Sequence, residues 1–231
     1  MSEAARSIHQ HGPGEPAAHE LPGSPIAASA AVRAVYEHLS ARLGRPVLTS
    51  CASAAPRVDV LLVPPSEEHD AITLYTVGMS AQPMALPAGV TQPARVELML
   101  RLPASWPVHD EAELRERAHG WPLHWLHALA QAPARLGTWF GAGHTIPNGE
   151  PPRPFAPDTE QCCFVLVPPT CLDDGQDVVA SADGPVQLLA AMPIYASELR
   201  VALEQGFSRL IEHLVAADVD DVLALTRKPA C

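Results

Sequence analysis

The sequence has little positive charge. Its 231 residues include 15 Lys and Arg against 26 Asp and Glu, which gives a formal net charge of −11. Proteins that bind the phosphate backbone need clustered Lys and Arg side chains, so this balance argues against a nucleic-acid partner. A strongly negative surface suits a basic protein partner, although acidity also has the general effect of keeping a protein soluble.

Long hydrophobic runs and secretion signals are also missing. No apolar run approaches the roughly 18–20 residues that span a bilayer, and the N-terminus has no basic segment followed by an apolar one. The number of cysteines is odd and two are adjacent, which disfavours a regular disulfide framework. The five cysteines are Cys51, Cys162, Cys163, Cys171 and Cys231. These absences predict a protein of the reducing cytoplasm that does not act at a membrane.

Proline is the residue type in excess. The 25 prolines cluster near the N-terminus and between the apolar runs, where a fixed φ and a missing N–H cost least. Residues 1–25 are rich in Gly, Pro, Ala, Ser, Glu and His without a hydrophobic period, so we predict a disordered tail there. The remaining sequence is globular in composition. We therefore predict one domain over residues 26–227 and a short C-terminal tail over residues 228–231.

Hydrophobic periodicity predicts an α+β domain. Apolar residues recur at helical spacing in three segments, and Gly120–Pro122 predicts an interruption in the second. The predicted helices are 25–43, 110–132 and 197–217. Other runs have the composition and length of strands. The predicted strands are 57–63, 72–79, 95–102, 161–167 and 186–193. In the third strand, Glu97 and Arg101 face away from the apolar side.

Known catalytic motifs are absent. The glycines Gly137, Gly141 and Gly143 are not part of a Walker loop or a Rossmann fingerprint, because the required Lys-Ser/Thr pair and acidic residue are missing. We interpret them as residues that allow a tight backbone path. There is also no G-x-S-x-G elbow and no Cys–His signature of a nucleophilic enzyme. The sequence therefore favours a protein that is not an enzyme and needs no cofactor.

A zinc-dependent hydrolase is the enzymatic alternative. Catalytic zinc needs three protein ligands and an open position, and His124 and His127 could share one face of a helix. The full candidate set is His119, His124, His127 and His144, with Glu160, Cys162 and Cys163 further along. However, no H-E-x-x-H motif is present, and adjacent cysteines in a strand would point to opposite faces. We therefore predict no metal site and keep the hydrolase as the alternative.

Six blocks of sequence follow one another in a distinctive order. They are ITLYTVGMS (72–80), VELMLRLP (96–103), the Trp-rich segment 121–129, GTWFGAGHTIPNGEPP (137–152), CCFVLVPP (162–169) and VQLLAAMPIYASEL (186–199). In this order and spacing, the sequence resembles the suppressor-of-fused domain family, particularly its compact bacterial members. The resemblance covers about residues 30–225. It implies a single α+β domain with a mixed, largely antiparallel sheet flanked by helices.

The resemblance also implies a function through protein binding. Animal members of the family sequester a transcription factor with the help of a second domain, for which this chain has no room, so that role is not expected here. Compact bacterial members resemble immunity proteins that neutralise toxins. A basic toxin domain would match the acidic chain in charge. A regulatory interaction protein without a toxin partner is a further alternative.

Two segments are candidates for contact with the partner. The first lies between predicted elements and contains Trp139, Phe140, His144, Asn148 and Glu150. Aromatic anchors and well-placed polar groups are common at interface hot spots, and connecting segments often carry function. The structural alternative is that Trp139 and Phe140 belong to the core and that His144 caps a neighbouring strand or loop.

The second candidate segment is 192–198, which contains Tyr195 and Glu198. It leads into the last predicted helix. The structural alternative is a simple helix start with Ser197 as the N-cap, because Ser is among the preferred N-cap residues.

Overall fold

The computed structural model describes residues 29–51, 57–108 and 117–231. The predicted tail over residues 1–25 and the first residues of the first predicted helix lie outside this part of the chain. Residues 110–116 of the second predicted helix also lie outside it. None of the helices in the described ranges is both long enough and apolar enough to cross a membrane.

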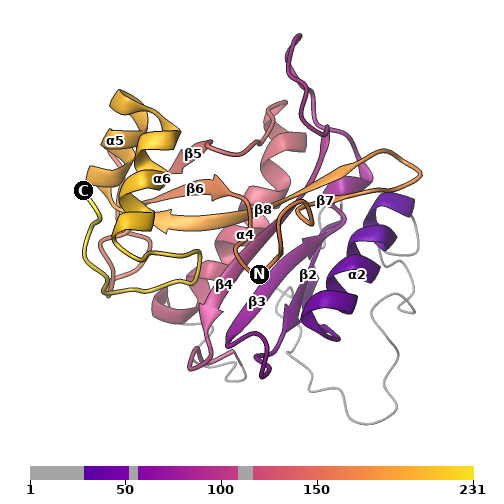
Figure 1. Ribbon diagram of the computed structural model, residues 1–231, viewed down its shortest axis with the longest axis horizontal. Coiled ribbons are helices and arrows are strands. Elements are labelled where there is room, and N and C mark those ends of the chain that lie inside the picture. The colour runs from indigo at the N-terminus through magenta and orange to yellow at the C-terminus, as the bar shows by residue number, and fades with distance from the viewer. Residues whose placement is uncertain (1–28, 52–56, 109–116) are drawn as a thin grey trace, which may run out of the picture.

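The described strands form one twisted sheet (Figure 1). They are β1 (Val47–Cys51), β2 (Asp59–Val63), β3 (Ala71–Val77), β4 (Arg95–Pro103), β5 (Thr145–Pro147), β6 (Cys163–Val167), β7 (Val178–Val179) and β8 (Val186–Ile194). Their order is β1-β2-β3-β4-β8-β6-β5, and β7 pairs with β8. The pairing of β4 with β8 is parallel, and every other strand pair is antiparallel. The prediction of a mixed, largely antiparallel sheet is therefore confirmed.

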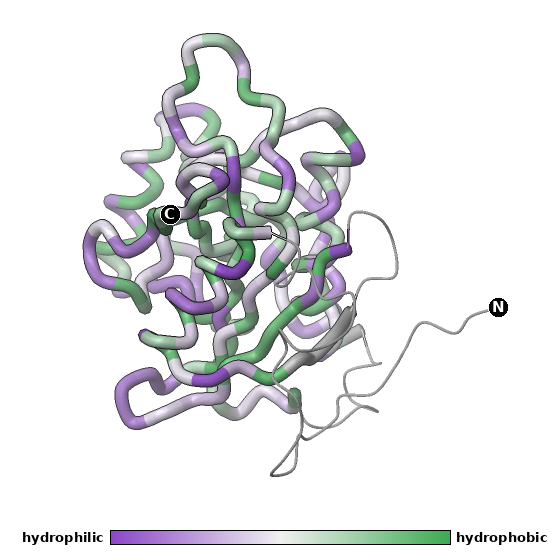
Figure 2. Tube along the Cα trace, turned by 90° about the vertical axis from the view of Figure 1, so that its right-hand side faces the viewer, coloured by the Kyte–Doolittle hydropathy of each residue, from purple (hydrophilic) through white to green (hydrophobic). Residues whose placement is uncertain are grey.

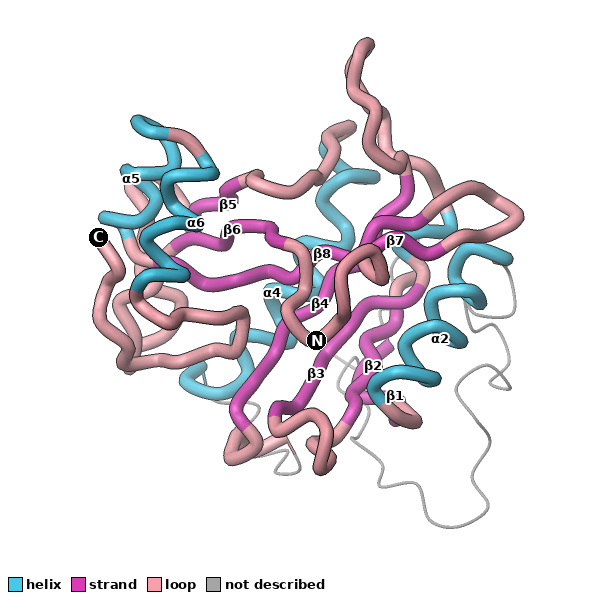
Figure 3. Tube along the Cα trace, viewed as in Figure 1, coloured by secondary structure: helices cyan, strands magenta, loops and turns pink. Residues whose placement is uncertain are grey.

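Helices cover both faces of the sheet (Figure 3). They are α2 (Ala30–Leu43), the short 3-10 turn η2 (Met79–Ala81), α4 (Arg117–Leu136), α5 (Ala196–Gln205) and α6 (Phe207–Ala216). In β4, Leu98 and Leu100 pack with the buried residues of α4, whereas Met99 packs with those of α2. In β8, Met192 and Ile194 pack with α5 and α6 on the same face as α2. The prediction of a single α+β domain flanked by helices is confirmed.

The strands carry the core. All five predicted strands are present, and each is buried along nearly its whole length. In Figure 2, hydrophobic residues follow the inner part of the trace, and most hydrophilic residues lie in the outer loops. Both faces of β4 are covered, so Glu97 and Arg101 are buried even though they lie on the polar side of the strand.

Two helix predictions need correction. The interruption predicted near Gly120–Pro122 is absent, because α4 is continuous through both residues. Burial of Trp121 and Leu126 against the sheet outweighs the local cost of Gly and Pro, about 1 and 3 kcal/mol. The helix predicted over 197–217 is instead two helices, because Gly206 between α5 and α6 has a φ of 93°. This left-handed conformation ends α5 and turns the chain.

Candidate partner-binding surface

The segment that follows α4 places one aromatic side chain at the surface of the protein and the next one inside it. Phe140 is buried among the core residues beneath α4. Trp139 and His144 are half-buried, and their ring centroids lie 4.2 Å apart in an edge-to-face arrangement. The backbone here is fixed to β6, because Gly143 N–H donates to Leu166 O at 2.7 Å and Leu166 N–H donates to His144 O at 2.9 Å.

The glycines of this segment leave room for neighbouring side chains. A Cβ atom at Gly141 would lie 2.2 Å from Gln92 Oε1 and 2.9 Å from Trp139 Cζ3. A Cβ atom at Gly143 would lie 3.0 Å from Phe207 Cγ, and the φ of Gly143 is 87°. The two distances at Gly141 are shorter than real Cβ contacts, and the distance at Gly143 is shorter than most of them, so the glycines permit the close packing of Gln92, Trp139 and Phe207.

Replacement of Gly143 by alanine should therefore cost more stability than a positive φ alone explains. We expect a loss of about 2–3 kcal/mol, of which about 1 kcal/mol is backbone strain and the rest is displacement of Phe207. Urea denaturation measures the total loss of stability. Gly89→Ala is the matched control, because Gly89 has a φ of 88° and nothing within 4 Å of a Cβ atom there. Equal losses in the two variants would show that Phe207 plays no part.

Phe207 joins the segment to the helices. It is half-buried at the start of α6, and the preceding turn of α5 carries Leu203, whose exposed fraction is 71%. We call Trp139, His144 and Phe207 the aromatic surface. It combines accessible apolar side chains with a backbone held by a sheet and two helices, the arrangement that suits a protein-binding patch.

Asn148 and Glu150 lie beyond the other end of β5. The Asn148 side chain donates to Arg153 O at 2.9 Å and to Pro154 O at 3.2 Å, so it organises the turn that it begins. Its backbone N–H donates to Cys162 O at 2.8 Å. Glu150 is exposed in that turn. The structure therefore places these two residues apart from Trp139 and His144.

Tyr195 and Glu198 form a buried cluster of hydrogen bonds with Arg227, which we call the Glu198–Arg227 knot. The Glu198 carboxylate is fully buried and accepts hydrogen bonds from both terminal nitrogens of Arg227, at 2.6 and 2.7 Å. It also accepts the Tyr195 N–H at 2.8 Å and the Ala230 N–H at 2.9 Å. The Tyr195 hydroxyl donates to Arg227 O, and the Arg227 guanidinium lies 4.8 Å from the centre of the Tyr195 ring.

This knot accounts for the second candidate segment. The N-cap of α5 is Tyr195, so Ser197 lies inside the helix instead of capping it. The Ala230 N–H donates to Glu198, so the segment 228–231, predicted from the sequence to be a C-terminal tail, is attached to the domain. An open hollow of about 460 Å³ lies beside the knot, with charged groups of both signs on its walls. Its lining comprises residues 157–160, Tyr195 and residues 225–229.

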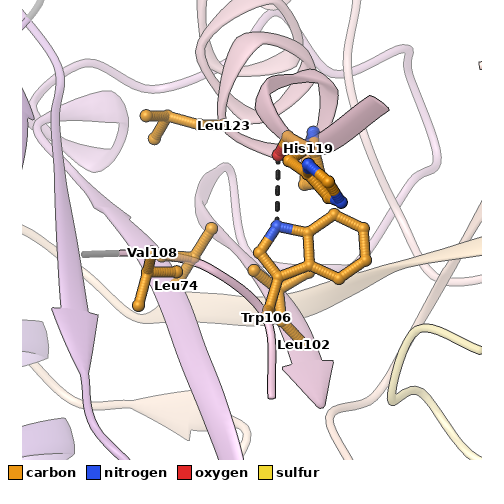
Figure 4. Close-up of a pocket in the computed structure, with 7 residues that line it drawn as sticks. Leu74, Leu102, Trp106, Val108, His119 and Leu123 are labelled. Carbon is orange, nitrogen blue, oxygen red and sulfur yellow. Dashed lines mark hydrogen bonds between the residues drawn. The ribbon is translucent and has the colours of Figure 1, made fainter. Parts of the chain in front are cut away.

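The four histidines of the zinc hypothesis do not form a metal site with one another or with other described residues. The His119 ring faces the edge of Trp106 at 5.6 Å, beside a pocket of about 10 Å³ (Figure 4). That volume holds about one water molecule. His124 lies against Trp125 and His144 against Trp139, and burial lowers the pKa of His127. Within the described ranges, no three His, Cys, Asp or Glu side chains are grouped so that they could hold a metal ion.

The adjacent cysteines at the start of β6 are poorly suited to nucleophilic chemistry. Cys162 and Cys163 are free and buried. Burial raises the pKa of Cys163 to about 12 and also raises the pKa of Cys162. Because the thiolate is the nucleophile and the metal ligand, such thiols are unreactive near neutral pH.

Comparison with solved structures places this fold among known proteins. A suppressor of fused homologue from Neisseria gonorrhoeae matches with a TM-score of 0.62 and 16% identity, over 87% of this chain and 97% of that chain. A chain of the Sufu–Fu complex matches with a TM-score of 0.58 and 14% identity, over 87% of this chain and 92% of that chain. Drosophila Suppressor of Fused matches with a TM-score of 0.59 and 15% identity, over 87% of this chain and 51% of the Drosophila chain.

Sequence comparison gives the family directly. A search of curated proteins finds no match. The family model for the suppressor of fused protein, however, matches residues 54–228, which include the aromatic surface and the Glu198–Arg227 knot. That match covers most of the chain, and the chain therefore belongs to the suppressor of fused family.

Proposed function

We propose that this chain is a non-catalytic protein-binding domain that acts as an immunity protein and neutralises a bacterial toxin in the cytoplasm. The observation that carries the binding function is the aromatic surface, where half-buried Trp139 lies on a segment whose backbone is hydrogen-bonded to β6. Aromatic anchors of this kind dominate the energy of many protein interfaces. The fold agrees with this function, because a similar chain is found in the Sufu–Fu complex.

The chemistry of the partner follows from charge. The chain has a net charge of −11, and exposed Glu204 adjoins Leu203 in α5. A basic partner would approach such a protein faster than a neutral one, because complementary fields steer diffusional encounter. A toxin domain with a basic surface fits this charge.

Co-expression tests the proposal. Each protein encoded beside the gene is produced in a bacterial host alone and together with this chain. One of them should stop growth when alone, and this chain should restore growth and form a stoichiometric complex with it in size-exclusion chromatography. If a neighbour binds but is harmless, the chain is a regulatory protein without a toxin. If no neighbour binds, the immunity function is wrong.

The contribution of Trp139 to binding can be measured once that complex is in hand. We expect Trp139→Ala to weaken affinity in isothermal titration calorimetry by at least about 30-fold, the loss typical of a hot-spot aromatic residue. Val215→Ala is the control, because Val215 is an exposed apolar residue at the far end of α6, with an exposed fraction of 70%. An affinity unchanged in Trp139→Ala, with the protein folded, would place the interface elsewhere.

A further inference from the structure

The loop between β3 and β4 holds the backbone of the aromatic surface. Gln92 Nε2 donates to Phe140 O at 2.5 Å, and Phe140 N–H donates to Met84 Sδ at 3.3 Å. Both backbone polar groups of Phe140 are therefore bound by side chains of one loop. Since Phe140 directly follows Trp139, these two contacts fix the peptide on which the Trp139 side chain stands.

Gln92 also packs beside the Trp139 ring. Its Oε1 and the Trp139 Cζ3 both lie close to the point where a Cβ atom of Gly141 would stand, at 2.2 and 2.9 Å. The Gln92 amide and the indole ring therefore occupy the space above Gly141 together. A change in the position of Gln92 would therefore alter the packing beside the ring.

The loop itself is anchored at its base. Met84 N–H donates to Ala94 O at 2.6 Å, which closes the loop. Near the start of the loop, Ser80 is bound twice: its N–H donates to buried Glu97 at 2.9 Å, and its carbonyl accepts from Arg95 at 2.6 Å. The sheet thus fixes the loop, and the loop fixes Trp139.

We infer that Gln92 is a positioning residue for the aromatic surface, which it holds in its binding geometry by donating to the Phe140 carbonyl and packing against the Trp139 ring. Its importance for the partner rests on the proposed function, whereas its effect on Trp139 is a property of the free protein. An amide is needed at this position because its N–H donates to a backbone carbonyl, which a carboxylate cannot do.

The test uses the indole N–H signals of the four tryptophans in ¹⁵N NMR spectra of the full chain, with Trp139→Phe to assign the signal of Trp139. In Gln92→Glu, the Trp139 signal should shift or broaden while those of Trp106, Trp121 and Trp125 stay in place. Gln82→Glu is the matched control, because it makes the same change at an exposed position of the same loop. It should leave all four signals unchanged.

Acid should reverse the effect. Below the ordinary Glu pKa of about 4.3, the new carboxyl group is protonated and can again donate to the Phe140 carbonyl. The Trp139 signal of Gln92→Glu should then return to the position that the wild-type signal has at the same pH. A general loss of packing would show no such return. If Gln92→Glu does not fold, Gln92→Ala removes the donor without adding charge and gives the same test without the acid step.

Two results would overturn the inference: a Trp139 signal that does not move in a folded variant, or a change in all four tryptophan signals together. Neither depends on the partner, so they remain decisive if no toxin exists. With a partner available, Gln92→Glu should weaken affinity about tenfold, the effect of one good hydrogen bond, and Gln82→Glu less than about twofold. A shifted Trp139 signal with unchanged affinity would support the positioning role in the free protein and contradict the proposed interface.

Discussion

Glu198→Ala is expected to lower the free energy of unfolding by about 3–5 kcal/mol, the cost of leaving one partner of a buried ion pair alone. The Arg227 side chain is only 11% exposed, so its charge would be poorly solvated without the carboxylate. The backbone N–H groups of Tyr195 and Ala230 would lose their acceptor as well. The segment that leads to the C-terminus would then detach from α5.

A second glutamate in the same region is the control for this prediction. Glu212 lies 2.6 Å from Arg209, the same separation as Glu198 and Arg227, but both members of this pair are exposed. Glu212→Ala should change the stability by less than about 0.5 kcal/mol, because exposed ion pairs contribute little. Urea denaturation of both variants measures the difference. A Glu198→Ala loss as small as that of Glu212→Ala would mean that the knot does not stabilise the fold.

The second large effect is a dependence of stability on pH that one buried carboxyl group causes. Glu97 is fully buried in β4. It accepts hydrogen bonds from the Thr76 hydroxyl at 2.6 Å, from the Gly78 N–H at 3.0 Å, and from the N–H and hydroxyl of Ser80 at 2.9 and 2.7 Å. All four donors are neutral. Burial raises the pKa of Glu97 to about 7, and the hydrogen bonds only partly oppose that rise.

A pKa that is higher in the folded protein than in the unfolded chain means that folding favours the protonated form. The stability that this group contributes is therefore fully present below about pH 4.5 and is lost as the pH rises through about 7. The difference in pKa corresponds to about 3 kcal/mol. Glu97→Gln mimics the protonated form, because its oxygen can accept from Gly78 and Ser80 while its nitrogen donates to Thr76.

We therefore expect the stability of Glu97→Gln relative to wild type to increase by about 2–3 kcal/mol between pH 5 and pH 8. Urea denaturation at four pH values across this range measures the change. Glu97→Leu is the control for loss of the acceptor, and it should be less stable than wild type at every pH because buried donors of Gly78 and Ser80 are left unpaired. A stability difference between Glu97→Gln and wild type that does not vary with pH would contradict the assignment.

The strands could be predicted from sequence because each is a short segment rich in apolar residues. β2, β3, β4, β6 and β8 are each buried along nearly their whole length. β5 was not predicted, because its three residues are too few to show a period. The break at Gly206 was missed for the opposite reason. Leu203, Phe207 and Leu210 continue a helical period across it, and the spacing of apolar residues does not show that a glycine between them has a positive φ.

The candidate site was less predictable, because its members depend on contacts between distant parts of the chain. Trp139 and Phe140 are adjacent in an irregular segment, where no period shows that Phe140 enters the core and Trp139 stays near the surface. The sequence also does not show that Glu198 pairs with Arg227. Nothing in the sequence indicates that Gln92 and Phe207 lie beside this segment, although the glycines that accommodate them belong to the block 137–152.

The parallel pairing of β4 with β8 has a consequence for how the chain folds. β1 to β4 pair with their neighbours in sequence, so this half of the sheet can form from local contacts. The other edge of β4 stays unpaired until β8 is available, and β8 begins only at Val186. Pairing between such distant segments is slow, because a long loop must close first. During synthesis on the ribosome, β4 therefore presents an unpaired apolar edge until β8 emerges, and this interval is when the nascent chain is most exposed to aggregation.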